Sequence, residues 1–360
     1  MIIIRNNVIS RGSVVTFLKP YGAFMAATAG VVLSISIVPA LTAAGEVNIY
    51  SYRKEHLIRP QLEAFAKATG ISYNIVTGRA DALAQRIRRE GINSPADVLL
   101  TVDAGRLVRA KTMGILQPIR SAALEHAIPS RYRDPEGYWF GLGLRARTLF
   151  YAVDRVDPAS LSTYEALIES KWKGRILVRS SSNIYNQSLL ASLIFHHGGA
   201  RAEAWARGIV ANFARKPQGG DRDQLRGLAA GVGDVAIANH YYYAQLKASK
   251  KPRDRQVVEK VKPFWPNQAG RGVHVNVSGA GVAKSSKNKA NAIKLIEFLA
   301  SAAGQRLYAD YSFEIPVRPG VEASPIVKLL GTFKPDVVDL EFLGRNNAEA
   351  VRTFDRAGWR

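Results

Sequence analysis

The sequence contains no cysteine among its 360 residues. That absence excludes disulfides, a thiolate nucleophile, a zinc ribbon and an iron–sulfur cluster held by the chain's own thiolates. Acidic residues are also scarce, with 29 Asp and Glu against 50 Lys and Arg. Hydrophobic residues make up 47% of the chain, which is enough to build a core and excludes a disordered chain. The length suggests about two domains.

The first 44 residues contain no acidic residue and have the pattern of an export signal. Arg5, Arg11 and Lys19 precede an apolar segment over residues 23–40, and small residues follow at 42–44. This order predicts a secretory signal peptide over residues 1–44, cleaved near Ala44. An uncleaved membrane anchor is the alternative, because the apolar segment approaches spanning length. We therefore predict an exported protein that is free in the periplasm.

The formal charge of +21 falls to +18 if residues 1–44 are removed, because their three basic residues are unopposed. Such a charge is found in nucleic-acid-binding proteins. Here the basic residues are scattered in short runs such as Lys250, Lys251 and Arg253, and no nucleic-acid-binding motif accompanies them. We expect no nucleic-acid partner and attribute the charge to solubility or to an anionic cell envelope.

Short hydrophobic strands alternate with amphipathic helices after residue 45. Strands are predicted over residues 47–50, 71–76 and 96–102, with helices over 57–68 and 81–90 between them. The alternation restarts in the second half of the chain. There we expect strands over 173–178 and 234–239 and helices over 187–195, 205–213, 224–230 and 289–301. This rhythm predicts an α/β fold with mixed, mostly parallel sheets flanked by helices.

Two long extended segments, residues 141–152 and 273–284, interrupt the alternation. Each is long enough to cross between two lobes. We therefore assign residues 45–143 and 278–360 to lobe 1 and residues 144–277 to lobe 2. Two crossings form a hinge, which suits closure around a ligand. In such sheets ligands bind at the carboxyl ends of strands.

Tyrosines gather where second-lobe strands are predicted to end. Tyr241, Tyr242 and Tyr243 follow the strand that ends at Asn239, and Tyr185 lies just past the strand over residues 173–178. A phenolate is a hard oxygen donor that suits a hard trivalent cation. A nearby ferric ion would lower the phenol pKa from its usual value of about 10. From the residues alone, an aromatic cluster that packs the cleft or binds a sugar is the alternative.

Two adjacent histidines, His196 and His197, precede two glycines. Neighbouring residues on a helix point in different directions, so this pair makes a poor chelate. We interpret the segment as a helix end.

Four segments together resemble one protein family. They are NSPADVLLTVDAGRL from Asn93, WKGRILVRSSSNIYNQSLLASL from Trp172, NHYYYAQL from Asn239 and FWPNQAGRGVHVNVSGAGVAK from Phe264. Through them, residues 46–360 resemble the periplasmic ferric-iron-binding proteins of ABC iron transporters, a branch of the two-lobed periplasmic binding proteins. The resemblance implies that three second-lobe tyrosines bind Fe³⁺, which by motif position are Tyr185, Tyr241 and Tyr242. Tyr243 is expected to pack or to support them.

The first-lobe part of the motif departs from the family pattern. Many members resemble YSSRHY, whose final His and Tyr contribute ligands, whereas this chain has Lys54 and Glu55 there. Glu55 and Tyr52 are therefore candidate ligands. Their alternatives are a solvated carboxylate at a helix start and a packing aromatic.

Some family members complete the metal shell with carbonate or water, and the guanidinium of arginine suits a planar oxyanion. The candidate partners of such an anion are Arg53, Arg106, Arg145 and Arg147. Arg145 and Arg147 alternate on one predicted strand and so share a face. Ordinary salt bridges are the alternative role for each.

The sequence therefore predicts a monomeric extracytoplasmic binding protein, not an enzyme, that captures Fe³⁺ and delivers it to an ABC permease in the inner membrane. A binding protein for a phosphate- or carboxylate-bearing solute is the first alternative. An exported hydrolase is the second, although the sequence contains no HExxH, nucleophile-elbow or phosphate-loop motif.

Overall fold

Eight strands form one sheet with the order β2-β1-β3-β8-β4-β6-β5, and β7 pairs with β4 off this path. The computed structural model describes residues 45–360, so the predicted signal peptide lies outside the described residues. The strands are β1 (Glu46–Ser51), β2 (Ser72–Thr77), β3 (Val98–Val102), β4 (Phe140–Ala152), β5 (Ile176–Leu177), β6 (Val235–Asn239), β7 (Val261–Phe264) and β8 (Val275–Val282).

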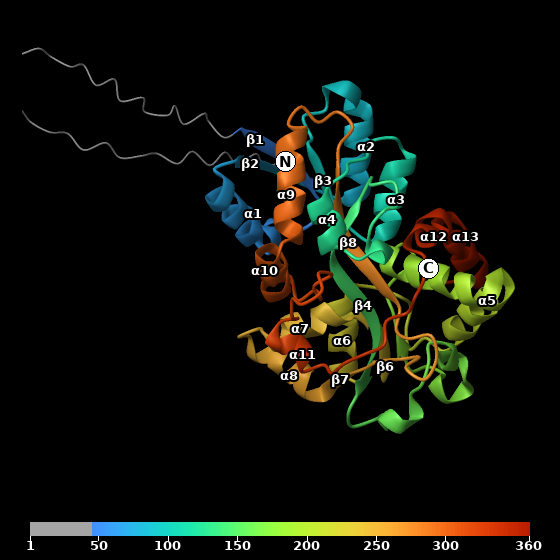
Figure 1. The fold of residues 1–360 in the computed structure, drawn as a ribbon. Helices are drawn as coiled ribbons and strands as arrows, with labels where there is room; N and C mark the ends of the chain where they lie inside the picture. The colour runs from blue at the N-terminus through green and yellow to red at the C-terminus, as the bar shows by residue number, and fades with distance from the viewer. Residues whose placement is uncertain (1–44) are drawn as a thin grey trace, which may run out of the picture.

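The two long strands β4 and β8 connect the two ends of this sheet. They are the extended segments of the sequence, and they pair antiparallel with each other from Phe140 to Ala146. β8 also pairs with β3, and β4 also pairs with β6 and β7, all antiparallel. The parallel pairs lie away from the crossing, between β1 and its neighbours and between β5 and β6. Figure 1 shows β4 and β8 passing from the upper half of the molecule to the lower half.

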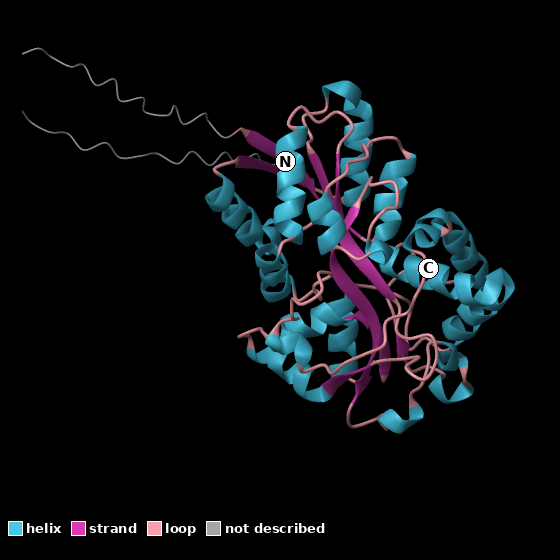
Figure 2. Cartoon of the chain, viewed as in Figure 1, coloured by secondary structure: helices cyan, strands magenta, loops and turns pink. Residues whose placement is uncertain are grey.

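Helices cover the sheet in both halves, as Figure 2 shows. The helices are α1 (Glu55–Thr69), α2 (Ala80–Glu90), α3 (Ala104–Thr112), α4 (Ala122–Ala127), α5 (Ile184–Ala211), α6 (Asp221–Ala229), α7 (His240–Lys247), α8 (Pro252–Lys260), α9 (Lys289–Ala300), α10 (Ala302–Ser312), α11 (Pro325–Lys328), α12 (Leu340–Arg345) and α13 (Asn347–Ala357). The α/β fold with two lobes, a mixed sheet, flanking helices and two crossing strands is confirmed. The expectation of mostly parallel pairing is wrong, because the crossing strands β4 and β8 pair antiparallel with each of their neighbours.

The C-terminal helices extend the packing across the predicted lobe boundary. α12 packs against α3, whereas α13 packs along α5, which begins in the segment assigned to lobe 2 (Figure 1). The division into residues 45–143 with 278–360 and residues 144–277 stays a prediction. The contacts of α13 show that the last residues of the chain join the two halves.

Most predicted elements lie within a few residues of the observed ones, and two differ in length. The helices expected over 187–195 and 205–213 form one long helix, α5, with a break at Gly198, whose φ is 77°. A positive φ interrupts a helix and is tolerated by glycine, so the expected helix end at this point becomes a kink. The strand expected over 173–178 shortens to the two residues of β5.

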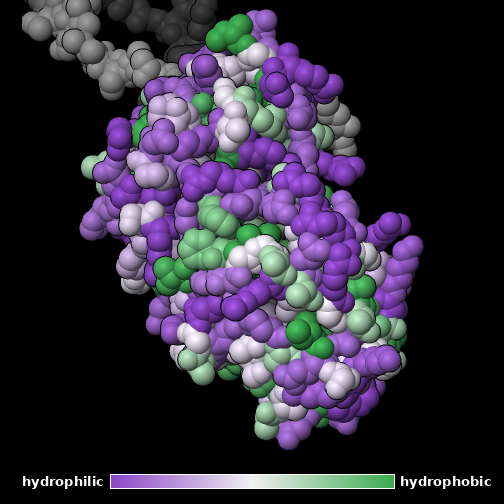
Figure 3. All heavy atoms as spheres, turned by 90° about the vertical axis from the view of Figure 1, so that its right-hand side faces the viewer, coloured by the Kyte–Doolittle hydropathy of each residue, from purple (hydrophilic) through white to green (hydrophobic). Residues whose placement is uncertain are grey.

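Within residues 45–360, no helix has the length and apolar content that crossing a bilayer requires. The face that carries α5, α12 and α13 is mostly hydrophilic, with hydrophobic residues in small patches (Figure 3).

Candidate functional site

The three second-lobe tyrosines lie at the starts of two helices. Tyr185 is the second residue of α5, and its backbone N–H donates to the side chain of the N-cap Asn183 at 3.2 Å. Tyr241 and Tyr242 lie in the first turn of α7, directly after β6. Each helix follows one strand of the parallel pair β5–β6, so the topology brings the three phenols to one edge of the sheet.

The consecutive tyrosines separate into two roles. The rings of Tyr241 and Tyr242 are 4.4 Å apart between centroids, and both residues line a cavity. Tyr243 instead packs against Phe150, with ring centroids 5.4 Å apart, and its hydroxyl donates to the carbonyl of Val258 at 3.3 Å. Helical rotation explains the split, because successive residues point about 100° apart.

The cavity has a volume of about 480 Å³ and lies between elements of both halves. Phenol and guanidinium groups dominate its wall. Its main polar lining residues are Tyr52, Arg53, Lys54, His56, Arg145, Arg179, Tyr185, Asp221, Arg222, Tyr241, Tyr242 and Glu314. A cavity with converging oxygen donors and several fixed cations suits a cation that arrives with negatively charged ligands.

Arg145, on β4, lies beneath the phenols. Its guanidinium carbon is 4.9 Å from the ring centre of Tyr185 and 4.4 Å from that of Tyr241, and Nη2 donates to the Tyr241 hydroxyl. Burial alone would raise the pKa of Tyr185, but Arg145 and hydrogen bonds with Tyr241 and Arg145 outweigh burial and hold this pKa below its usual value. Burial raises the pKa values of Tyr241 and Tyr242. Tyr185 is therefore the phenol that loses its proton most readily.

A buried carboxylate, Glu314, holds two of the predicted anion-binding arginines. It forms ion pairs with Arg53 and, at 3.3 Å, with Arg145. Glu314 and Ser278 also share a hydrogen bond. Glu314 is a single glutamate that follows α10, and nothing in the local sequence distinguishes it as a site residue. Arg53 and Arg145 thus have a partner within the protein.

Arg147 is held in a second buried network. Its Nη1 lies 3.1 Å from Asp221 Oδ1 and donates to Asn239 Oδ1 at 2.9 Å. Arg179 binds the other oxygen of Asp221 at 2.9 Å. Arg145 and Arg147 do share one face beneath Tyr185. Both are ion-paired within the protein, although Arg145 Nε and Nη1 and Arg147 Nε have no hydrogen-bond partner.

Among the described residues, Arg106 differs from the other candidate arginines because it forms no ion pair with a carboxylate. Its guanidinium carbon is 4.6 Å from the ring centre of Tyr52, and its Nε and Nη1 atoms are buried without a hydrogen-bond partner. It lines a second cavity of about 280 Å³, together with Arg79 and Arg179. Tyr52 and Arg179 line both cavities, so the two spaces adjoin.

The first-lobe candidates occupy different places. Tyr52 is half-buried and lines the cavity, whereas Glu55 pairs with Arg59 one turn along α1 and is not among the cavity-lining residues. Its neighbours Lys54 and His56 do line the cavity. His56 belongs to no motif that would mark it as a site residue from the sequence. Glu55 as a metal ligand stays a prediction that requires it to give up Arg59.

His240 does not line the cavity but stabilises the backbone next to it. Its Nδ1 accepts from the backbone N–H of Ala146 at 3.1 Å, and its Nε2 lies 3.0 Å from the carbonyl of Phe313. Burial lowers the pKa of His240 to about 4, so the ring is neutral at pH 7. Both nitrogens are therefore occupied by backbone groups, and the ring holds β4 against the start of α7.

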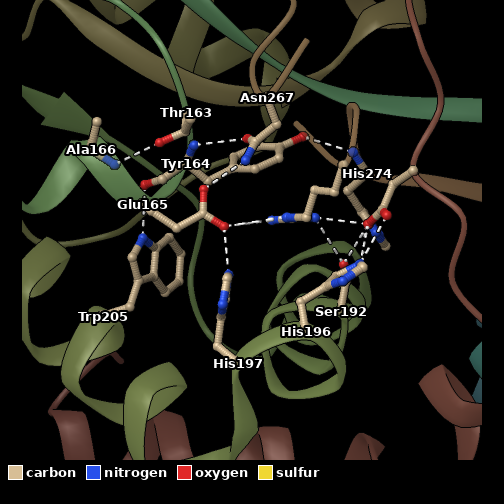
Figure 4. Close-up of polar contacts among 12 residues, drawn as sticks. Thr163, Tyr164, Glu165, Ala166, Ser192, His196, His197, Trp205, Asn267 and His274 are labelled. Atoms are coloured by element: carbon tan, nitrogen blue, oxygen red, sulfur yellow. Dashed lines mark hydrogen bonds and ion pairs between the residues drawn. The ribbon is translucent and has the colours of Figure 1, made fainter. Parts of the chain in front are cut away.

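The adjacent histidines of α5 bind separate carboxylates, as Figure 4 shows. His196 Nε2 lies 2.9 Å from Asp336, and His197 Nε2 lies 2.9 Å from Glu165. Arg271 bridges the two carboxylates, at 2.7 Å to Asp336 and 3.1 Å to Glu165. Their divergence agrees with the expectation that they do not form a chelate.

Comparison with known proteins places the chain in a family. Residues 93–330 match the family model of bacterial extracellular solute-binding proteins. Iron uptake protein A2 of Synechocystis is 46% identical over 340 residues, which cover 93% of this chain and 97% of that protein.

Two solved structures have the same fold. A Trichodesmium protein in complex with iron and citrate ligands is 50% identical, with a TM-score of 0.85, covering 88% of this chain and all of that one. The ferric binding protein from Campylobacter jejuni is 40% identical, with a TM-score of 0.84, covering 87% of this chain and all of that one. The family match spans more than half of the sequence. This chain therefore belongs to the bacterial extracellular solute-binding proteins.

Proposed function

We propose that this protein captures Fe³⁺ outside the cytoplasm and delivers it to an ABC permease in the inner membrane. The observation that carries the proposal is the convergence of the Tyr185, Tyr241 and Tyr242 side chains on one cavity. Relatives named for iron uptake and ferric binding support the same ligand. The family's role in solute binding supports a transport function rather than catalysis.

In this proposal Tyr185, Tyr241 and Tyr242 bind the metal as phenolates. Fe³⁺ favours hard, charged oxygen donors, and its own charge lowers the pKa of a phenol that it contacts. Arg145 already favours the charged form of Tyr185. Metal binding would therefore begin at Tyr185 and recruit the other two phenols, with Tyr52 and His56 facing the same cavity from the first half of the chain.

A companion oxyanion such as carbonate would complete the metal shell, and we assign it to the side of the cavity near Arg106. Arg53, Arg145 and Arg147 are ion-paired with Glu314 and Asp221, whereas Arg106 forms no ion pair among the described residues and has two buried donor atoms without partners. Arg145 also has two such donor atoms, but Glu314 already balances its charge. A buried donor without an acceptor is costly, so an oxyanion that accepts from it gains affinity.

The proposal is tested by a visible-absorption titration of metal-stripped protein, purified after export, with ferric citrate. We expect a saturating one-to-one tyrosinate–iron charge-transfer band. Tyr185→Phe combined with Tyr242→Phe should abolish the band, because two phenolate donors are removed. Tyr311→Phe is the matched control, since Tyr311 is exposed and lies outside the cavity, and it should leave the band unchanged.

The same titration with and without bicarbonate tests the companion anion. We expect bicarbonate to raise the apparent iron affinity of the wild-type protein and to have less effect on Arg106→Gln. A wild-type protein that develops no band at any iron ratio would refute direct binding of Fe³⁺ by tyrosinate. Identical bicarbonate dependence in Arg106→Gln would refute only the assignment of the anion.

A further inference from the structure

A strongly basic surface lies around α8, and none of its basic residues lines the iron cavity. It is formed by Lys247, Lys250, Lys251, Arg253, Arg255, Lys260 and Lys262, all of which are exposed. Glu259 is the one exposed acidic residue between positions 247 and 262. The other acid in this stretch, Asp254, is buried and pairs with Arg226 at 3.2 Å. We call these seven residues the α8 surface.

The helix geometry directs these charges outward. Asp254 and Val257 are buried, and α8 packs against α6 and α7. Arg253, Arg255 and Lys260 lie on the other faces of α8 and are exposed to solvent. Lys262 extends the surface onto β7, and Lys247 joins it from the last turn of α7. Figure 1 shows α8 at the lower edge of the molecule, on the side opposite α12 and α13.

The α8 surface differs from the exposed basic residues of α12 and α13 in its lack of ion pairs. Arg345, Arg352 and Arg356 on α12 and α13 are each paired with carboxylates on the same or a neighbouring helix. Within residues 45–360, none of the seven α8-surface side chains forms an ion pair. Seven positive charges accompanied by one exposed carboxylate repel one another, so this arrangement raises the local potential and is relieved by an anionic partner.

The composition favours a lipid headgroup over a protein as that partner. Protein interfaces are depleted in lysine and built around aromatic or aliphatic anchors. Five of the seven α8-surface residues are lysines, and no large hydrophobic side chain between positions 247 and 262 is exposed. Clusters of four to eight Lys and Arg bind anionic membrane surfaces by charge alone.

We propose that the α8 surface docks the protein reversibly on anionic phospholipid. The surface begins at Lys247, at the far end of the helix whose first turn carries Tyr241 and Tyr242, about 9 Å along the helix axis from Tyr241. Docking through the α8 surface holds the protein at the membrane and places α7, a helix of the iron cavity, next to the membrane contact. The proposal goes beyond iron binding and does not depend on it, so it is tested with iron-free protein.

The test is co-sedimentation of protein purified after export with vesicles of phosphatidylcholine alone or with one third phosphatidylglycerol. We expect binding to the anionic vesicles only, and release at high salt. Lys250→Glu, Lys251→Glu and Lys262→Glu together should lower the partition coefficient at least about tenfold. The matched control carries the same charge change at Lys284, Lys287 and Lys289, which are exposed in the other half, and should lose less than about twofold.

Far-UV circular dichroism and ferric titration of both triple variants show that each is folded. Equal losses in the two variants would overturn the proposal, because attraction by the total charge would then suffice. Failure of the wild-type protein to bind anionic vesicles at low salt would also overturn it and leave an acidic protein face as the partner to seek.

Discussion

At the scale of single residues, the candidate site depends on charges that are buried and paired. Burial alone would raise the pKa of Glu314, but Arg53 and Arg145 outweigh burial and hold this pKa below its usual value. Removing one member of a buried pair leaves the other charge uncompensated, which is more costly than losing an exposed pair. The cavity wall is thus fixed before any ligand arrives.

A buried histidine gives the folded protein a specific dependence on pH. Burial, reinforced by Arg271, Arg147 and His196, lowers the pKa of His274 to about 3. In the unfolded chain its pKa is about 6.5. As pH falls below 6.5, the unfolded state binds a proton that the folded state does not. Stability from this group is therefore present above pH 6.5 and is lost as pH falls toward 3.

We expect His274→Gln to reduce the loss of stability on acidification. For the wild-type protein, His274 alone should lower the free energy of unfolding by about 2 kcal/mol between pH 6.5 and pH 5. The measurement is urea unfolding of iron-free protein at the two pH values. His126→Gln, at an exposed position, is the control and should retain the full dependence. An unchanged slope in His274→Gln would contradict this account.

At the scale of elements, the two halves are joined by the crossing strands β4 and β8. The backbone comes very close to two glycines of β8 there. Gly279 lies on β8 opposite Gly141, and a Cβ atom at position 279 would lie 2.3 Å from the carbonyl oxygen of Phe140. At Gly281 a Cβ atom would lie 2.5 Å from the carbonyl oxygen of Tyr138. Glycine is required at both positions because the obstructing atoms belong to backbone and cannot rotate away.

We expect Gly279→Ala to lower the free energy of unfolding by about 1–3 kcal/mol, the usual cost of overpacking a core. The matched control is Gly199→Ala in α5, where a Cβ atom would meet nothing within 4 Å. The control should be neutral or slightly stabilising, because alanine reduces the entropy of the unfolded chain. Urea denaturation of both variants measures the difference, and equal stabilities would refute the requirement for glycine at the crossing.

At the scale of the whole molecule, one buried contact links Asp103, the residue that follows β3, to Ser188 on α5. Asp103 has a φ of 77°, which is rare for a residue other than glycine. Its carboxylate accepts from Ser188 Oγ at 2.8 and 2.9 Å and caps α3 through Gly105. Strained backbone persists only where its surroundings hold it. Because Asp103 follows β3 in one half and Ser188 lies on α5 in the other, this contact requires the two halves to be close together.

We expect ferric iron to favour a closed form of the protein in proportion to its preference for that form. Small-angle X-ray scattering should show a smaller radius of gyration after ferric citrate is added to metal-stripped protein. The Tyr185→Phe and Tyr242→Phe double variant should show no such change, because it lacks the donors that bridge to the metal. Equal compaction in that variant would mean that citrate, not iron, closes the molecule.

The sequence by itself determined the local elements and the identity of the tyrosine cluster. Hydrophobic periodicity is a local property, so it predicted β1, α1, β3 and β6 to within a few residues. The residues after β6 also indicated that Tyr241 and Tyr242 would begin a helix or loop at a strand end.

Only the tertiary structure decided which charges meet around that cluster. Glu314 contacts Arg53 across 261 residues of sequence, and α13 packs on α5. The structure also shows that Arg145 and Arg147 are paired with carboxylates, whereas Arg106 forms no ion pair among the described residues. The physical reason is that side-chain periodicity specifies which face of an element is buried, but not which distant element covers that face.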